Sequence, residues 1–372
     1  METLYAEGSQ LSLAVSESGR DWAVPEQQLT VMILEPASAP TMSVVMKVSF
    51  EDARSGCTRL AILKMFDRRF APSVRRRINP VYDDDAESAW CEYVRDGKAP
   101  ALFAFLHEQL RLEDEGITRP PRTEEEMRVK KGKKEGIMQW KALQLFEDET
   151  RAYATLSHFQ GRYIPRFFAQ VYLTVKEPSP DPHNSDDNNP TLRPEYFQIP
   201  GVLLEYVDGF NLTDLGSTNV PQHKWHSIIQ QAVDAARYIN DAGVINTDCQ
   251  PRNVVVQRET LRPLHIDFAQ CLFAEDMGWE EFGETKIMID NQGAIGTVMV
   301  GKLQRAGVKL PEIRYNRFRD WGRVGRILTH FPFAVTPWSG VGYGVGVGVL
   351  ILAWVVVRRR GILRGLNYFR NR

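Results

Sequence analysis

Residues 244–270 read VINTDCQPRNVVVQRETLRPLHIDFAQ, and most of what we expect of the fold follows from this stretch. Two short apolar runs, VVV and LHI, are separated by a polar turn, which is the pattern of a β-hairpin. Asp248 stands five residues before Asn253, ahead of the first run, and Asp267 follows the second run. Because a hairpin brings its two strand ends together, we expect Asn253 and Asp267 to point into one cleft.

These residue types suit phosphoryl transfer from ATP. That reaction uses one carboxylate near the acceptor hydroxyl, and an amide oxygen with a second carboxylate to hold magnesium on the phosphates. The spacing D-x-x-x-x-N recurs by chance, but Asp-Phe at a strand end 14 residues after the Asn makes it more specific. We therefore assign Asp248 as the catalytic residue and Asn253 and Asp267 as Mg²⁺ ligands. The competing interpretation of Asp248 is an ordinary turn aspartate that caps a loop.

The same motifs resemble those of the protein-kinase-like superfamily, above all small fungal kinase-like proteins and the aminoglycoside and choline phosphotransferases. In that family the catalytic loop reads H-R/G-D-x-x-x-x-N and the metal motif reads D-F-G. Here the matching residues read NTDCQPRN (246–253) and DFA (267–269). The resemblance implies ATP and Mg²⁺ as cofactors, and it implies that Asp248 orients or deprotonates the acceptor hydroxyl.

An upstream motif extends the resemblance to the phosphate-binding lysine. The run AILK (61–64) looks like the V-A-I-K of the family's third strand, which implies that Lys64 contacts the α- and β-phosphates. Its partner would be a glutamate on the following helix. Glu149 in ETRAYATL is the best match, and Glu147 is the second choice.

A further motif is similar to the strand and hinge whose backbone pairs with adenine. It reads LLEYV (203–207) and places Leu204 at the gatekeeper position. By this resemblance the cofactor-binding residues are Lys64, Glu149, Leu204, Glu205 and Val207.

Five departures from the family pattern keep a second interpretation open. The turn EPASAPTM (35–42) has no glycine, Asn246 replaces the usual His, and Ala269 replaces the Gly of D-F-G. Gln250 stands where protein kinases carry a lysine that neutralises the transferred phosphate, and no A-P-E motif follows. The alternative to an ATP-dependent phosphotransferase is therefore a weak or inactive pseudokinase that acts as a nucleotide-binding or membrane-anchored scaffold.

The rest of the chain supports an α+β fold. Hydrophobic residues make up 43% and charged residues 25% of the 372 residues, a balance that allows a sizeable core. Apolar runs at 29–34, 43–50 and 59–66 predict an antiparallel meander, and helical spacing predicts helices near 137–158 and 221–242. We therefore predict a two-lobed protein-kinase-like fold, with an antiparallel-sheet N-lobe and a mainly helical C-lobe.

Composition along the chain divides it into segments. The expected segments are an N-terminal extension (1–24), the N-lobe (25–207) with an insertion (67–135), the C-lobe (208–330), a transmembrane helix (338–357) and a basic tail (358–372). The insertion contains helical pieces and ends in the basic run 128–134, which we interpret as a mobile, solvated end.

The last of these segments predicts a membrane anchor. Residues 338–357 (WSGVGYGVGVGVLILAWVVV) carry no charge and precede Arg358, and 20 residues of helix span ~30 Å. We expect a single-pass C-terminal helix that leaves the kinase-like domain in the cytoplasm, where ATP is available. The alternative is a wholly cytoplasmic protein.

Charge and cysteine content limit the partners. The net charge of −1 gives no general attraction to nucleic acid, so none is expected as a partner. The four cysteines are scattered, without the spacing of a zinc site. The acceptor is a hydroxyl of a small molecule or a protein that the sequence does not identify.

Overall fold

A computed structural model describes residues 4–19, 27–35, 41–53, 55–79, 82–109, 124–174 and 196–315. The chain divides into two compact units. The first comprises Met1–Thr150 with Arg166–Tyr206, and the second comprises Arg151–Pro165 with Val207–Arg372.

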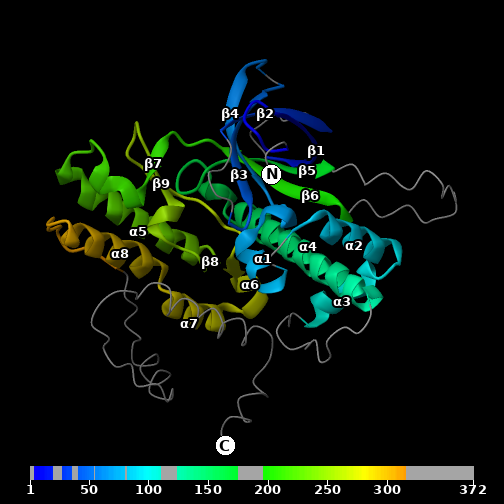
Figure 1. The fold of residues 1–372 in the computed structure, drawn as a ribbon. Helices are drawn as coiled ribbons and strands as arrows, with labels where there is room; N and C mark the ends of the chain where they lie inside the picture. Colours follow the sequence, from blue (N-terminus) through cyan, green and yellow to red (C-terminus); the bar gives the residue numbers. More distant parts are fainter. Residues whose placement is uncertain are drawn as a thin grey trace, which may run out of the picture. The chain divides into compact units, whose positions relative to one another are not determined.

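Six antiparallel strands form a closed barrel in the first unit, in the order β1-β2-β3-β4-β6-β5 (Figure 1). The strands are β1 (Gln10–Ser18), β2 (Gln28–Glu35), β3 (Val44–Glu51), β4 (Thr58–Met65), β5 (Phe167–Thr174) and β6 (Gln198–Glu205). Alternate residues of each strand fill the barrel interior, as the pleat requires. Fully buried interior residues include Leu13, Val31, Val48, Leu63, Val171 and Leu203.

The closed barrel corrects our predicted fold class, which had an antiparallel sheet in a kinase-like N-lobe and no barrel. Strand β1 closes the sheet, although it comes from the segment that we assigned to an N-terminal extension. It pairs with β2 through Leu13 and Leu29, and with β5 through Val15 and Val171. A strand that finds partners on both sides leaves no sheet edge exposed, and this is the physical reason for closure.

The insertion after β4 is helical. It comprises η1 (Arg68–Phe70), α1 (Pro72–Ile78), α2 (Asp84–Arg95) and α3 (Ala99–Gln109), and it leads into the long helix α4 (Glu124–Thr155). The basic residues from 128 to 134 lie within α4, whereas we expected a mobile end. Lys131 Nζ is 2.9 Å from Asp83 Oδ1 and 2.5 Å from Asp85 Oδ2, so acidic residues at the start of α2 hold this part of the run.

Helices α2 and α4 cross closely because α4 carries glycine at the crossing. A Cβ atom on Gly132 would lie 2.5 Å from the Ala89 carbonyl oxygen, and one on Gly136 would lie 2.7 Å from the Trp90 ring. Both helices therefore approach backbone to backbone.

The second unit contains more strand than we predicted. Its strands are β7 (Gly209–Asn211), β8 (Val244–Asn246), β9 (Val254–Gln257), β10 (Pro263–His265) and β11 (Cys271–Phe273). They form one three-stranded sheet, β10-β9-β7, and one two-stranded sheet, β11-β8. The helices are α5 (Trp225–Asp241), α6 (Ala274–Met277), α7 (Trp279–Ile289) and α8 (Asn291–Arg305). Strands β9 and β10 are the hairpin expected from the VVV and LHI runs, with Val254 opposite His265.

Our predicted fold class also included a transmembrane helix. Within the part of the chain that the structure describes, no helix combines the length and the apolar character that a membrane crossing needs. The segment proposed for that role, 338–357, and the basic tail 358–372 lie outside the described residues.

Candidate functional site

The first unit brings Lys64 and Glu149 together. Lys64 Nζ on β4 lies 2.5 Å from Glu149 Oε2 on α4, although the two residues are 85 positions apart in sequence. Their side chains are 7% and 0% exposed, respectively, so this is a buried ion pair. Glu147, the second choice, is exposed, and its carboxylate accepts a hydrogen bond from Gln144 at 2.9 Å. Of the two glutamates, Glu149 is the one that contacts Lys64.

The pairing register of β4 shows which residues share the outer face of the barrel with Lys64. Ala61 is buried and faces the interior, whereas Ile62, two residues before Lys64, shares its face. Leu204 on β6 lies opposite Ile62, and Val45 on β3 lies opposite Lys64. Val45 is 38% exposed, so part of this outer face is apolar surface in contact with solvent.

Glu205 is held by the start of β5. Its carboxylate accepts hydrogen bonds from the backbone N–H of Arg166 at 2.9 Å and from Arg166 Nη1 at 2.6 Å. The backbone N–H of Glu205 also donates a hydrogen bond to the Arg166 carbonyl, at 2.9 Å. Any contact of Glu205 with a base would therefore use its carbonyl oxygen. Val207 is half-buried and begins the second segment of the second unit, Val207–Arg372.

The second unit holds Asp248, Asn253 and Asp267, and Asn246 connects their loops. The Asn246 side chain accepts a hydrogen bond from the Asp248 backbone N–H at 2.9 Å and donates one to the Asp267 carbonyl at 2.8 Å. Asn253 Nδ2 donates to the Asp248 carbonyl at 2.9 Å and to Asp248 Oδ2 at 3.0 Å. Through its two hydrogen bonds, Asn246 thus holds the loops of Asp248 and Asp267 together.

Asp267 follows β10 in an unusual backbone conformation. Its φ of +64° lies in the left-handed region, which few residues other than glycine adopt, Asn and Asp more often than the rest. The residue before it is anchored, because the Ile266 N–H donates to the Asn253 carbonyl at 2.9 Å. Phe268 is buried and packs edge-on against Tyr153, with ring centroids 5.7 Å apart. Asn253 and Asp267 therefore lie at the same end of the hairpin, on supports that restrict their movement.

These two residues fit a magnesium ion in part. The amide nitrogen of Asn253 is used for Asp248, so its amide oxygen is the atom that could contact a cation, and Asp267 adds a carboxylate. Mg²⁺ prefers such oxygen ligands and usually completes its shell with water and substrate phosphates. Among the described residues no group of three His, Cys, Asp or Glu side chains is placed to hold a metal ion. An ion held by Asn253 and Asp267 would therefore depend on the phosphates of a nucleotide.

Arg252 is a site residue that sequence reasoning missed. Its Nη2 lies 2.8 Å from Asp248 Oδ1 and 3.0 Å from Oδ2, and its Nη1 donates to Gln250 Oε1 at 2.8 Å. The Arg252 side chain is 56% exposed. The guanidinium thus places a positive charge beside Asp248, where Gln250 carries none. The available signal was the arginine directly before Asn253.

Two buried ionisable side chains near these loops have pKa values far from neutral pH. Burial, and secondarily the charge of Asp248, raises the pKa of the Cys249 thiol to about 12. Burial lowers the pKa of His265 to about 4, and its Nε2 lies 2.9 Å from the Ala232 carbonyl. Neither side chain is suited to nucleophilic or acid–base chemistry near pH 7.

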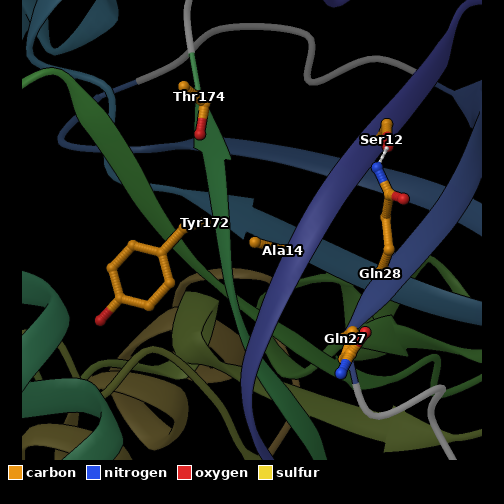
Figure 2. Close-up of a pocket in the computed structure, with 6 residues that line it drawn as sticks. All are labelled: Ser12, Ala14, Gln27, Gln28, Tyr172 and Thr174. Carbon is orange, nitrogen blue, oxygen red and sulfur yellow. Dashed lines mark hydrogen bonds between the residues drawn. The ribbon is translucent and has the colours of Figure 1, made fainter. Parts of the chain in front are cut away.

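A pocket of about 410 Å³ lies elsewhere on the barrel (Figure 2). It lies between β1, β2 and β5, and its lining comprises Ser12, Ala14, Gln27, Gln28, Tyr172 and Thr174. Gln28 Nε2 donates to Ser12 Oγ across it at 2.7 Å. Its lining has no charged side chain, so this pocket lacks the cations that offset the charge of a triphosphate.

Comparison with known proteins gives limited similarity to protein kinases. No protein-family model matches the chain. A 59-residue segment is 37% identical to CBL-interacting protein kinase 1 of Oryza sativa subsp. japonica, and the match covers 15% of this chain and 13% of that protein. At the level of the superfamily this match supports a relation to protein kinases. It does not distinguish the fungal or phosphotransferase branches that the motifs resemble.

Solved structures similar to the chain include three mutant forms of the PknI kinase domain of Mycobacterium tuberculosis. Each is 14% identical, with TM-scores of 0.30, 0.29 and 0.29. The matches cover 64–68% of this chain and 60–64% of those chains, so the chain spans less than two thirds of the relatives it matches. TM-scores this low do not establish a shared fold, and the functional conclusion has to come from the side chains described above.

Proposed function

We propose that this protein transfers the γ-phosphoryl group of ATP to a hydroxyl group of an acceptor. The observation that carries the proposal is the buried pair of Lys64 and Glu149, at 2.5 Å. A buried ion pair costs desolvation energy and is weak support for stability alone, so its presence needs another reason. Orientation of a lysine ammonium toward phosphate oxygens is such a reason.

The loops of the second unit would supply the remaining groups. In the reaction, the acceptor oxygen bonds to the γ-phosphorus, the bond from that phosphorus to the β–γ bridging oxygen breaks, and ADP leaves. Asp248 would orient the acceptor and take its proton. Arg252, now paired with Asp248, would neutralise charge on the transferred group. Asn253 and Asp267 would hold Mg²⁺, which offsets the phosphate charges when bound.

The apolar outer face around Ile62 and Leu204 supports adenine as the base that this nucleotide carries. Val45, on the same face, is 38% exposed, whereas Ile62 is half-buried and Leu204 is buried. Exposed apolar surface of this kind suits a planar base. The acceptor remains a hydroxyl of a small molecule or a protein.

Measuring ATP binding and turnover by the purified full chain, with and without Mg²⁺, tests the proposal. We expect Mg²⁺ to strengthen ATP binding in the wild type, and we expect Asp267→Ala to remove this dependence while the protein stays folded. Asp276→Ala, a change to a carboxylate bound by Arg151, is the matched control. Binding without turnover of ATP favours the nucleotide-binding scaffold, and the absence of ATP binding overturns both interpretations.

A further inference from the structure

Glu135 lies at the centre of a buried cluster of charged residues on the first unit. Its Oε2 accepts a hydrogen bond from Arg68 Nη1 at 2.6 Å, and its Oε1 accepts one from Arg75 Nη2 at 2.5 Å. Arg75 Nη1 also donates to Oε2, at 3.1 Å, and Asn79 Nδ2 donates to Oε1 at 2.7 Å. Burial alone would raise the pKa of Glu135, but the hydrogen bond from Arg75 and the two arginine charges hold it below its usual range.

The second acidic group in contact with Arg68 comes from α2. Arg68 Nη2 is 2.5 Å from Glu87 Oε2, which also accepts a hydrogen bond from Tyr82 at 3.0 Å. Arg68 therefore connects the insertion with α4 through two carboxylates. The side chains of Arg68 and Glu135 are 5% and 0% exposed, so water contributes little to their solvation.

Glu135 and Glu149 are on the same helix and nearly the same face of it. They are 14 residues apart within α4, which at 100° per residue brings them within about 40° of each other and ~21 Å apart along the axis. Their cationic partners also come from one segment, since Arg68 follows Lys64 by four residues. Helix α4 is thus fastened at two points to β4 and its continuation.

We propose that Glu135, Arg68 and Arg75 form a positioning cluster that holds α4 so that Glu149 stays paired with Lys64. The pair is then assembled in the resting protein by the insertion itself. This inference rests on the proposed function, because the Lys64–Glu149 pair that the cluster positions belongs to the proposed site. The two glycines at the α2–α4 crossing support it, since close packing there transmits the position of the insertion to α4.

The test uses two measurements on the full chain that require no turnover. One is the rate at which an amine-reactive acetylating reagent modifies Lys64, followed by mass spectrometry. The other is hydrogen exchange of the α4 amides around Glu149. In Glu135→Gln we expect both rates to rise about tenfold, because local opening of α4 becomes easier. Lys131→Met is the matched control, because Lys131 lies on the same helix but binds the partly exposed Asp83 and Asp85.

Unchanged Lys64 modification and unchanged exchange in a folded Glu135→Gln protein overturn the inference. If circular dichroism shows that this variant does not fold, Arg75→Lys decides, because it keeps the charge and loses the two-nitrogen contact with Glu135. A rise in both rates in Arg75→Lys supports the cluster, and wild-type rates refute it. Where the wild type also turns over ATP, Glu135→Gln should lower kcat more than it raises KM. A wild type without turnover contradicts the proposed function. The rates of Lys64 modification and of α4 hydrogen exchange then still test whether the cluster positions Glu149.

Discussion

The buried charges of the Lys64 ammonium and the Glu149 carboxylate neutralise each other. Replacement of Lys64 by methionine removes the cation 2.5 Å from a carboxylate that is 0% exposed. We expect Lys64→Met to lower the free energy of unfolding by ~3–5 kcal/mol and to lower ATP turnover. The double variant Lys64→Met/Glu149→Leu should recover most of the stability and none of the turnover. Urea denaturation and a turnover assay separate the two effects, and a single variant as stable as the wild type contradicts the argument.

Asp248 should act on the acceptor and not on the nucleotide. In Asp248→Asn the loop keeps an oxygen for the Arg252 and Gln250 hydrogen bonds, so we expect a folded protein. Turnover should fall by ~10²–10⁴-fold, the usual contribution of a positioned base, with ATP affinity nearly unchanged. Isothermal titration with ATP and a phosphotransfer assay measure the two quantities. Equal turnover in the variant and the wild type would show that Asp248 only caps its loop.

The four cysteines should differ sharply in reactivity. Cys57 is exposed, whereas Cys91, Cys249 and Cys271 are buried, and the pKa of Cys249 is raised to about 12. Because the thiolate is the reactive form, iodoacetamide at pH 8 should modify Cys57 first and leave the other three until the protein unfolds. Mass spectrometry with increasing urea follows the order. Rapid modification of Cys249 in the native protein would contradict its burial beside Asp248.

Local sequence pattern predicted some site residues and not others. The Asp248–Asn253 spacing and the hairpin before Asp267 are local, and the structure has that hairpin as β9 and β10. The contact of Arg252 with Asp248 depends on the irregular loop between them, which no periodic pattern describes. Asp267 has a left-handed φ, and its carbonyl accepts a hydrogen bond from Asn246, 21 residues away, which a local pattern does not show either.

Substitution of helix glycines tests whether helix propensity or packing decides stability. Gly→Ala in an open helix position stabilises by ~0.5–1 kcal/mol, because glycine has the higher entropy when unfolded. At Gly132 the new methyl group would lie 2.5 Å from the Ala89 carbonyl oxygen, so we expect Gly132→Ala to destabilise the protein. Gly283→Ala in α7, where no atom lies within 4 Å of the new Cβ, should stabilise it.

Thermal unfolding of both glycine variants measures the difference, and the two should shift Tm in opposite directions. A stabilising Gly132→Ala would mean that α2 and α4 do not approach each other as described. Because this crossing lies three residues from Glu135, its loss should also increase hydrogen exchange in α4 around that residue.

We did not predict strand β1 from its sequence, because its place in the barrel depends on residues far along the chain. Its sequence QLSLAVSES has only a few apolar residues, alternating with Ser and Glu, and reads as easily as a polar extension. What makes it a strand is pairing with β2 beside it and with β5, which lies far along the chain. Such non-local pairing is decided by the closure of the barrel, whereas the meander of β2, β3 and β4 could be predicted from consecutive runs.

Closure by β1 makes a prediction for the barrel as a unit. Leu13 is 0% exposed and points into the interior, whereas its neighbour Ala14 is exposed on the outer face. Leu13→Asp places a carboxylate among apolar residues, which costs several kcal/mol, and should abolish the cooperative unfolding transition of the first unit. Ala14→Asp carries the same charge on the outside and should change the free energy of unfolding by less than ~1 kcal/mol. Urea titration monitored by tryptophan fluorescence distinguishes the two. If residues 10–18 were an unpaired extension, both substitutions would be neutral, because neither would bury a charge.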